Sequence, residues 1–156
     1  MRLSDQPEYL AAIPAMYEGD YVTARRNLRA VLSRAEAEAD TLTASYLLQL
    51  LGDTEARSGD KALAHTLHGK ALSLDPVNPH SLLIYARSLF SAFREPALAQ
   101  LRIAEVESLI QSPTWVPDGD DPDRAWYQQE CKKLRASIHD ACSPNNSFKS
   151  DGYAAA

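Results

Sequence analysis

The stretch that decides the fold opens with a glycine followed by an aspartate. The chain reads GDKALAHTLHGKAL over residues 59–72 and GDYVTARRNLRAVL over residues 19–32, so the pair recurs after 40 residues. Behind each aspartate, small or apolar residues follow at spacings of four, four and three. These spacings keep one face of a helix apolar. Each stretch therefore predicts a helix that packs through a single face.

The Gly-Asp pair itself predicts a tight corner between two helices. Glycine readily takes the left-handed conformation that ends a helix. Aspartate accepts hydrogen bonds from the unpaired N–H groups that begin the next one. Gly19-Asp20 and Gly59-Asp60 therefore indicate two helix–turn–helix hairpins.

Composition favours an all-α globular domain. The chain has 156 residues, 45% of them hydrophobic and 24% charged, and is rich in alanine and leucine. Alanine and leucine lose little freedom in a helix. The formal net charge is −5, which disfavours nucleic acid as a partner because phosphate backbones repel an acidic surface. The basic stretch of Arg25, Arg26, Arg29 and Arg34 is interpreted as a solvated helix face.

The two cysteines and the lack of long apolar runs indicate a cytoplasmic protein. Cys131 and Cys142 lie 11 residues apart in one predicted helix, a separation of about 16 Å that prevents a bridge between them. Reduced thiols are typical of the cytoplasm. The sequence MRLSDQPEYL lacks the apolar run of a signal peptide, and no segment has the length of a membrane span. We therefore expect no membrane insertion.

One unit resembles a tetratricopeptide repeat. It runs from Ser45 to about Asn78 and closes with Leu74-Asp75-Pro76. The large, small, aromatic and proline positions of that family are occupied here by Leu48, Leu51, Gly52, Gly59, Ala64, His68, Ala71 and Pro76. Two residues depart from the pattern, because Glu55 and His68 stand where an aromatic residue is usual.

The units on either side are less regular. In the third, Arg94-Glu95-Pro96 replaces Gly-Asp, one residue short, and the second helix is expected to turn Ala97, Leu101 and Ala104 inward. In the first, Asp5 is expected to cap a helix that Pro14 should kink or split. The second helix of that unit is expected to run on through residues 35–39, before Asp40 caps the next helix.

After Ile110 the repeat pattern ends. Residues 111–123 read as a loop, and Asp121-Pro122 as the start of a helix that reaches about Cys142. Its expected apolar contacts are Trp126, Leu134, Ile138 and Cys142. Such a helix would cover the last open core face of a repeat array. The resemblance thus implies one domain over residues 1–142, with repeats at about 5–40, 41–78 and 79–111, a capping helix at about 122–142 and a right-handed superhelix. Residues 143–156, with a proline, two asparagines, a glycine and terminal alanines, have little to pack and are expected to form a mobile tail.

Three features were weighed as chemical sites. His65 and His68 have a spacing that suits two metal ligands, but no third ligand is evident and His68 occupies a packing position. Asp118, Asp120, Asp121 and Asp123 do not have the spacing of an EF-hand. Lys132 and Lys133 could lower the pKa of Cys131, although a packed thiol is the simpler interpretation. No catalytic motif stands out, so we expect a non-enzymatic protein without metal or cofactor.

The resemblance implies a binding role instead. In this family the first helix of each pair lines a concave groove, and tyrosine and arginine often anchor partners. The corresponding positions are Gln6, Tyr9, Leu10, Ile13, Tyr17, Tyr46, Gln49, Leu50, Asp53, Arg57, His80, Leu83, Ile84 and Arg87. We expect an adaptor or chaperone that holds another protein or peptide there, with Asp53, Arg57 and Arg87 selecting the partner.

Other functions remain open at this point. A self-assembling scaffold, hence a homo-oligomer, is one alternative, because the irregular first unit can leave apolar surface uncovered. A three-repeat bacterial secretion chaperone is similar in size and architecture, and a metal- or thiol-dependent enzyme is the remote alternative. The family's clamp for EEVD-type C-termini uses Lys, Asn and Arg. The matching positions here are Tyr9, Ile13, Leu50, His80 and Ile84, so we expect no tight binding of such a terminus.

Overall fold

Helices account for all the regular structure in the part of the chain that is described. A computed structural model describes residues 1–117 and 122–143, and within them it contains no strand. The elements are the 3₁₀ turn η1 (Leu3–Asp5) and the helices α1 (Pro7–Glu18), α2 (Tyr21–Ala37), α3 (Thr41–Ser58), α4 (Lys61–Leu74), α5 (Pro79–Ser91), α6 (Pro96–Gln111) and α7 (Arg124–Cys142). The predicted all-α class is confirmed.

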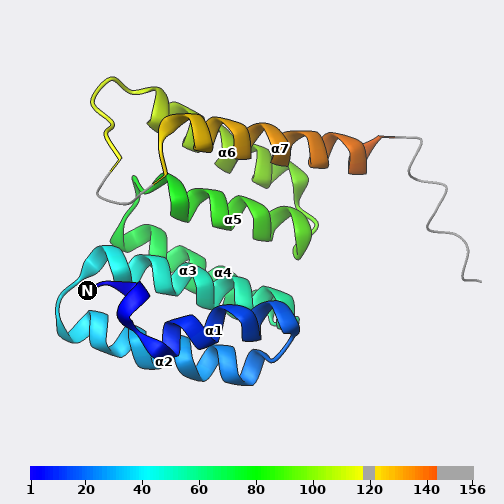
Figure 1. The fold of residues 1–156 in the computed structure, drawn as a ribbon. Coiled ribbons are helices and arrows are strands. Elements are labelled where there is room, and N and C mark those ends of the chain that lie inside the picture. The colour runs from blue at the N-terminus through cyan, green and yellow to red at the C-terminus, as the bar shows by residue number, and fades with distance from the viewer. Residues whose placement is uncertain (118–121, 144–156) are drawn as a thin grey trace, which may run out of the picture.

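The helices pair in chain order. α1 packs with α2, α3 with α4 and α5 with α6, while α2–α3 and α3–α5 contacts join successive pairs. Figure 1 shows the pairs stacked from α1 and α2 at one end to α6 and α7 at the other. α7 contacts α6 and also α5, so it covers the last pair as the capping-helix prediction requires.

The predicted Gly-Asp corners are present. Gly19 and Gly59 have φ angles of 86° and 98°, in the left-handed region that suits glycine. Asp20 and Asp60 then accept hydrogen bonds from the backbone N–H groups three residues ahead, both at 3.1 Å. Asp40 caps α3 in the same way, through the N–H of Thr43 at 3.1 Å.

The third corner differs from the prediction. Its left-handed residue is Arg94, with φ 59°, and α6 buries Ala99, Ile103 and Val106. Each of these buried residues lies 35 positions after its counterpart in α4, where the buried residues are Ala64, His68 and Ala71. The residues that were predicted to face inward lie only 33 positions after the same counterparts. The predicted residues Ala97, Leu101 and Ala104 are therefore exposed, and that expectation was wrong. The third corner was predicted to be one residue short, but it holds two residues more than that prediction.

The first unit is less disrupted than expected. α1 runs unbroken from Pro7 to Glu18 although Pro14 lies inside it, so the helix is not split. Pro14 is exposed, which keeps its ring out of the core. Asp5 belongs to η1 and does not cap α1, whose N-cap position is held by Gln6. The second helix of this unit was predicted to run through residues 35–39, but α2 ends at Ala37, and Ala39 has a positive φ of 54°.

The start of α7 also required correction. Asp123, not Asp121-Pro122, caps it, and accepts from the Trp126 N–H at 2.8 Å. Leu134 and Ile138 are buried as predicted, but Cys142 is exposed, and Tyr127 and Cys131 supply the other buried contacts. Asp118, Asp120 and Asp121 of the acidic cluster, and residues 144–156 of the predicted tail, lie outside the described residues.

The core has two main clusters. One surrounds Leu28, Leu47 and Leu51 between the first two helix pairs. The other surrounds Ile103 and Tyr127 between α5, α6 and α7. Side chains of α3, α4 and α5 contribute to both.

Candidate functional site

A row of aromatic side chains crosses four helices. Tyr9 of α1, Tyr46 of α3, His80 of α5 and Trp126 of α7 form this aromatic row. Successive ring centroids are separated by 6.4, 5.3 and 6.1 Å. The His80 and Trp126 rings stack with an interplanar angle of 13°. Three of the four residues were predicted for the groove, and the structure brings those three together.

The middle of the row is uncharged at neutral pH. Burial, together with the nearby positive charge of Arg87, lowers the pKa of His80 to about 4. Burial raises the pKa of the Tyr46 hydroxyl, which lies 3.2 Å from the Tyr9 hydroxyl in a hydrogen bond. The row therefore offers ring faces and a hydroxyl pair without a formal charge at Tyr46 or His80.

A cleft of about 520 Å³ opens beside the row. Its lining residues include the first turns of α3 and α5. Figure 1 shows both helices beginning on the side of the molecule that holds the N-terminus. Apolar side chains that are largely exposed stand in its wall, at Leu42 (53%), Val77 (62%) and Val116 (74%). The remaining lining residues are Leu3, Thr43, Tyr46, Asp75, Asn78, Pro79, His80, Trp115 and Pro122.

The charged groove residues of the prediction are already paired. Arg57 donates to Asp53 at 2.9 Å, and Asp53 also accepts from the Ser88 hydroxyl at 3.1 Å. Arg87 donates to Glu130 of α7 at 2.5 Å. A partner would have to compete with these bonds, so their value for selecting one is lower than expected.

Several predicted groove residues belong to the core. Gln49, Leu50, Leu83 and Ile84 are each at most 9% exposed, so they cannot line an open groove. Ile13 is half-buried, and Leu10 and Tyr17 are exposed outside the cleft. The Arg57 guanidinium lies 4.9 Å from the centroid of the Tyr17 ring.

Sequence reasoning missed the tryptophans. Trp115 lines the cleft and Trp126 ends the aromatic row, yet the prediction assigned them to a loop and to simple helix packing. They are the only two tryptophans in the chain, and Tyr127 contacts both rings, at 5.8 and 5.1 Å. Trp115 lies in the loop before α7 and Trp126 in the first turn of α7, which places Trp126 against His80 at the end of the row.

The predicted histidine pair has a packing role. His68 is fully buried, hydrogen-bonds Gln49 and stacks on Tyr85 with centroids 4.5 Å apart. Burial lowers its pKa to about 3. His65 stacks on Phe93 at 3.9 Å. Among residues 1–117 and 122–143, no group of three or more His, Cys, Asp and Glu residues could hold a metal ion.

Cys131 is a core thiol. It is 1% exposed, and burial raises its pKa to about 11. The interpretation as a packed thiol is confirmed, and Lys132 and Lys133 do not lower its pKa, because both lysines are exposed while the thiol is buried. A thiol with this pKa is almost entirely protonated at neutral pH, which is unsuitable for a nucleophile.

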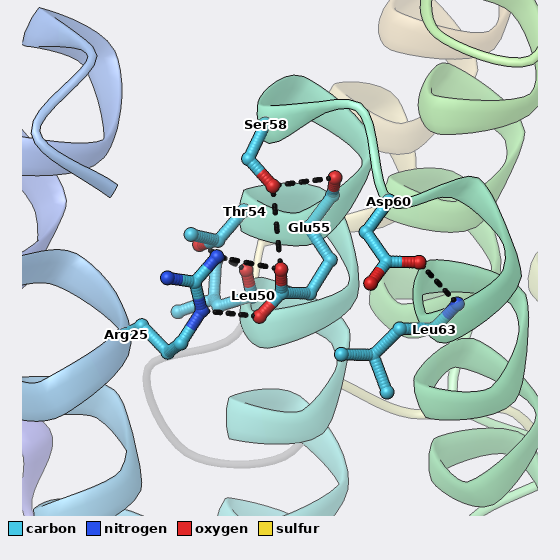
Figure 2. A network of polar contacts seen from close by, with 7 residues as sticks. All are labelled: Arg25, Leu50, Thr54, Glu55, Ser58, Asp60 and Leu63. Carbon is cyan, nitrogen blue, oxygen red and sulfur yellow. Dashed lines mark hydrogen bonds and ion pairs between the residues drawn. The ribbon is translucent and has the colours of Figure 1, made fainter. Parts of the chain in front are cut away.

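Two arginines of the basic stretch are not simply solvated. Figure 2 shows Arg25 of α2 reaching Glu55 of α3. The two carboxylate oxygens of Glu55 accept hydrogen bonds from the Nε and Nη2 groups of Arg25, at 2.6 and 2.7 Å. The Ser58 hydroxyl donates to the Glu55 backbone carbonyl at 2.9 Å. Arg34 pairs with Glu8 at 2.7 Å. Glu55, where the repeat pattern expects an aromatic residue, thus joins two helix pairs through charge.

Within the described part of the chain, no helix combines the length and apolarity that crossing a membrane demands. The sequence matches no protein-family model, and neither a curated protein nor a solved structure resembles it significantly.

Proposed function

We propose that this protein is a non-enzymatic interaction module, an adaptor or chaperone, that holds a segment of a partner protein along the aromatic row and in the adjoining cleft. The observation that carries this proposal is the continuity of the two features. Tyr46 and His80 belong both to the row and to the cleft wall. The resemblance to tetratricopeptide repeats supports the same function.

The exposed side chains set the scale of the interaction. Full burial of a Leu or Val side chain contributes about 1.5–3 kcal/mol, and Leu42, Val77 and Val116 are each roughly half to three quarters exposed. Together they offer a few kcal/mol at most. Association costs about 4–15 kcal/mol in lost freedom. A partner must therefore also contact the rings of the row.

A set of matched variants tests this use of the row. Tyr46→Ala removes the central ring, while Tyr46→Phe keeps the ring and removes the hydroxyl. Tyr17→Ala is the control, because Tyr17 is 67% exposed and lies outside the row. Photo-crosslinked partners would be captured from cell extract with each variant, and helicity checked by circular dichroism.

We expect Tyr46→Ala to reduce capture of the main partner at least tenfold, with Tyr46→Phe and Tyr17→Ala close to the unaltered chain. Arg87→Ala should also weaken capture, through the loss of its bond to Glu130, which holds α5 against α7. Normal capture by folded Tyr46→Ala would place the partner on another surface.

Self-assembly is a second candidate, favoured by one observation. Leu98 and Leu101 on the outer face of α6 are 45% and 60% exposed and line a shallow cleft of about 350 Å³. Light scattering over a concentration series checks this alternative. Growth in mass that Leu101→Glu abolishes would support it, and a constant monomer mass would exclude it.

A further inference from the structure

Charge is distributed unevenly around the cleft. Of its described lining residues, Asp75 alone carries a formal charge, since His80 is neutral with its pKa lowered to about 4. The other lining side chains are aromatic or aliphatic, apart from the amide of Asn78 and the hydroxyl groups of Thr43 and Tyr46. The cleft is therefore an apolar space with one negative group, in a chain whose net charge is −5.

Asp75 is held in place. It is 8% exposed at the C-cap of α4, and its Oδ2 accepts from the Asn78 side-chain nitrogen at 2.9 Å. Asn78 in turn accepts from the backbone N–H groups of His80 and Ser81, at 2.9 and 3.1 Å. No lysine or arginine of the described residues forms an ion pair with Asp75. A carboxylate that is mostly buried without a cation strongly favours a ligand that supplies one.

We infer that the cleft takes an arginine or lysine side chain from an extended segment of the partner protein, with the cation at Asp75 and the apolar stem against Val77 and Tyr46. This inference rests on the proposed function and specifies its partner. Aromatic faces also attract cations, at about 0.5–2 kcal/mol each. The rings of Tyr46 and His80 are 5.3 Å apart and border the same space as Asp75.

Trp115 completes the argument for the position of the cation. The guanidinium of Arg124 lies 6.0 Å from the centroid of the Trp115 ring. It donates hydrogen bonds to the backbone carbonyls of Ser112 and Trp115. Arg124 does not line the cleft. It would repel a second cation near Trp115, so the partner's cation is directed to Asp75, which lines the same cleft.

The volume indicates what accompanies the basic residue. About 520 Å³ is in the range of pockets that hold drug-sized ligands, which is more than one side chain fills. The exposed aliphatic groups at Leu42 and Val116 suit apolar residues on either side of the cation. The segment expected here is thus a basic residue between apolar neighbours, and not a run of charges.

The test begins with the folded chain of residues 1–156 and a random peptide library displayed on phage. We expect enrichment of peptides with arginine or lysine at one fixed position between apolar residues. The strongest peptide is then synthesised in three forms, with arginine, norleucine or glutamate at that position. The fluorescence of Trp115 and Trp126 reports binding, since both tryptophans border the site.

The expected result is binding of the arginine form about tenfold or more tighter than the norleucine form, because a hydrogen bond to a charged group contributes about that factor. The glutamate form should bind weakest. The Asp75→Asn variant should bind the arginine and norleucine forms with about equal affinity. Its affinity for the norleucine form should equal that of the unaltered chain. Asp140→Asn is the control, because Asp140 is in the last turn of α7, about 21 Å along the helix from Trp126.

Each other outcome overturns a defined statement. Enriched peptides without a basic preference would reject the inference and leave the proposed function standing. A library that yields no binder would reject both. Agmatine that binds as tightly as the arginine peptide would show a small-molecule amine site in place of a peptide site. If Asp75→Asn fails to fold, the three peptide forms on the unaltered chain still decide the question.

Discussion

Glu55 of α3 and Arg25 of α2 form a two-point ion pair, at 2.6 and 2.7 Å, where the first and second helix pairs meet. Glu55 is 2% exposed, whereas the Arg25 side chain is 29% exposed. The arginine therefore brings a charge from the surface to a carboxylate in the core. Removing either partner has a different consequence from removing both.

Arg25→Leu is expected to lower the free energy of unfolding by about 2–4 kcal/mol, because it leaves the buried Glu55 carboxylate unpaired. Glu55→Leu should cost less, since Arg25 can turn toward water. The double variant should recover most of the loss. Urea unfolding of all four chains measures the coupling, and strictly additive effects would mean that the pair contributes nothing as a pair.

Gly52 and His68 predict a steric limit. A Cβ on Gly52 would lie 2.8 Å from an atom of the His68 ring, which is held by Gln49 and stacked on Tyr85. Gly52→Ala should therefore destabilise the fold by about 1–3 kcal/mol, despite the better helix propensity of alanine. Gly69→Ala, with open space at the Cβ, is the matched control and should be neutral or stabilising. Equal thermal stability of the two variants would contradict the prediction.

Acid stability depends on His68. An unfolded histidine binds a proton near pH 6.5, but in the folded chain burial lowers the pKa of His68 to about 3. Its contribution to stability is therefore complete above pH 6.5 and is lost as pH falls toward 3, by up to about 1.4 kcal/mol per pH unit. His68→Phe should flatten the stability profile between pH 6.5 and 5, whatever its effect at neutral pH. An unchanged slope in urea titrations would rule this out.

Arg94 is expected to be replaceable with a gain. Its φ of 59° is in the left-handed region. At the corresponding corners of the first two helix pairs, this conformation is adopted by glycines, Gly19 and Gly59. Arg94→Gly should raise the free energy of unfolding by about 0.5–1 kcal/mol, because glycine adopts this conformation without strain. Arg94→Ala, which removes the side chain and keeps the strain, separates the two causes. A gain from alanine as large as that from glycine would argue against the backbone explanation.

The cysteines should react at very different rates. Cys142 is exposed, whereas Cys131 is buried with its pKa raised to about 11. A thiol reagent such as Ellman's should modify one equivalent quickly at pH 8, and the second only at the rate of unfolding. Cys142→Ser should abolish the fast phase. A fast phase that persists in this variant would show that Cys131 is accessible and would revive the thiol-enzyme alternative.

Local signals predicted the corners, and tertiary contacts explain what they missed. Gly59 and Asp60 act within a few residues, so the sequence alone indicates both the left-handed end and the cap. The predicted register of α6 was two residues too short because no glycine marks the Arg94 corner. The partner of Glu55 lies 30 residues away on another helix, and no local pattern points to it.

The candidate site was predictable in part for the same reason. Tyr46 and His80 stand at the same position of successive units, 34 residues apart, so the resemblance to the repeat family placed both on the groove face. Tyr9 stands 37 residues before Tyr46, one helical turn away from the equivalent position, and its ring still reaches Tyr46. Trp115 reaches the cleft from the loop before α7, where periodicity has no meaning. Gln49 and Leu83 have the spacing of groove residues but are covered by neighbouring helices.

The placement of the tryptophans has a consequence for any spectroscopic study of folding. Both indoles pack with the cluster of α5, α6 and α7, and the cluster of α1, α2 and α3 has none. Emission changes during denaturation therefore register the C-terminal half alone, while far-ultraviolet dichroism averages over both halves. A difference between the two midpoints would reveal stepwise melting from the N-terminal end, which arrays with nearest-neighbour contacts permit.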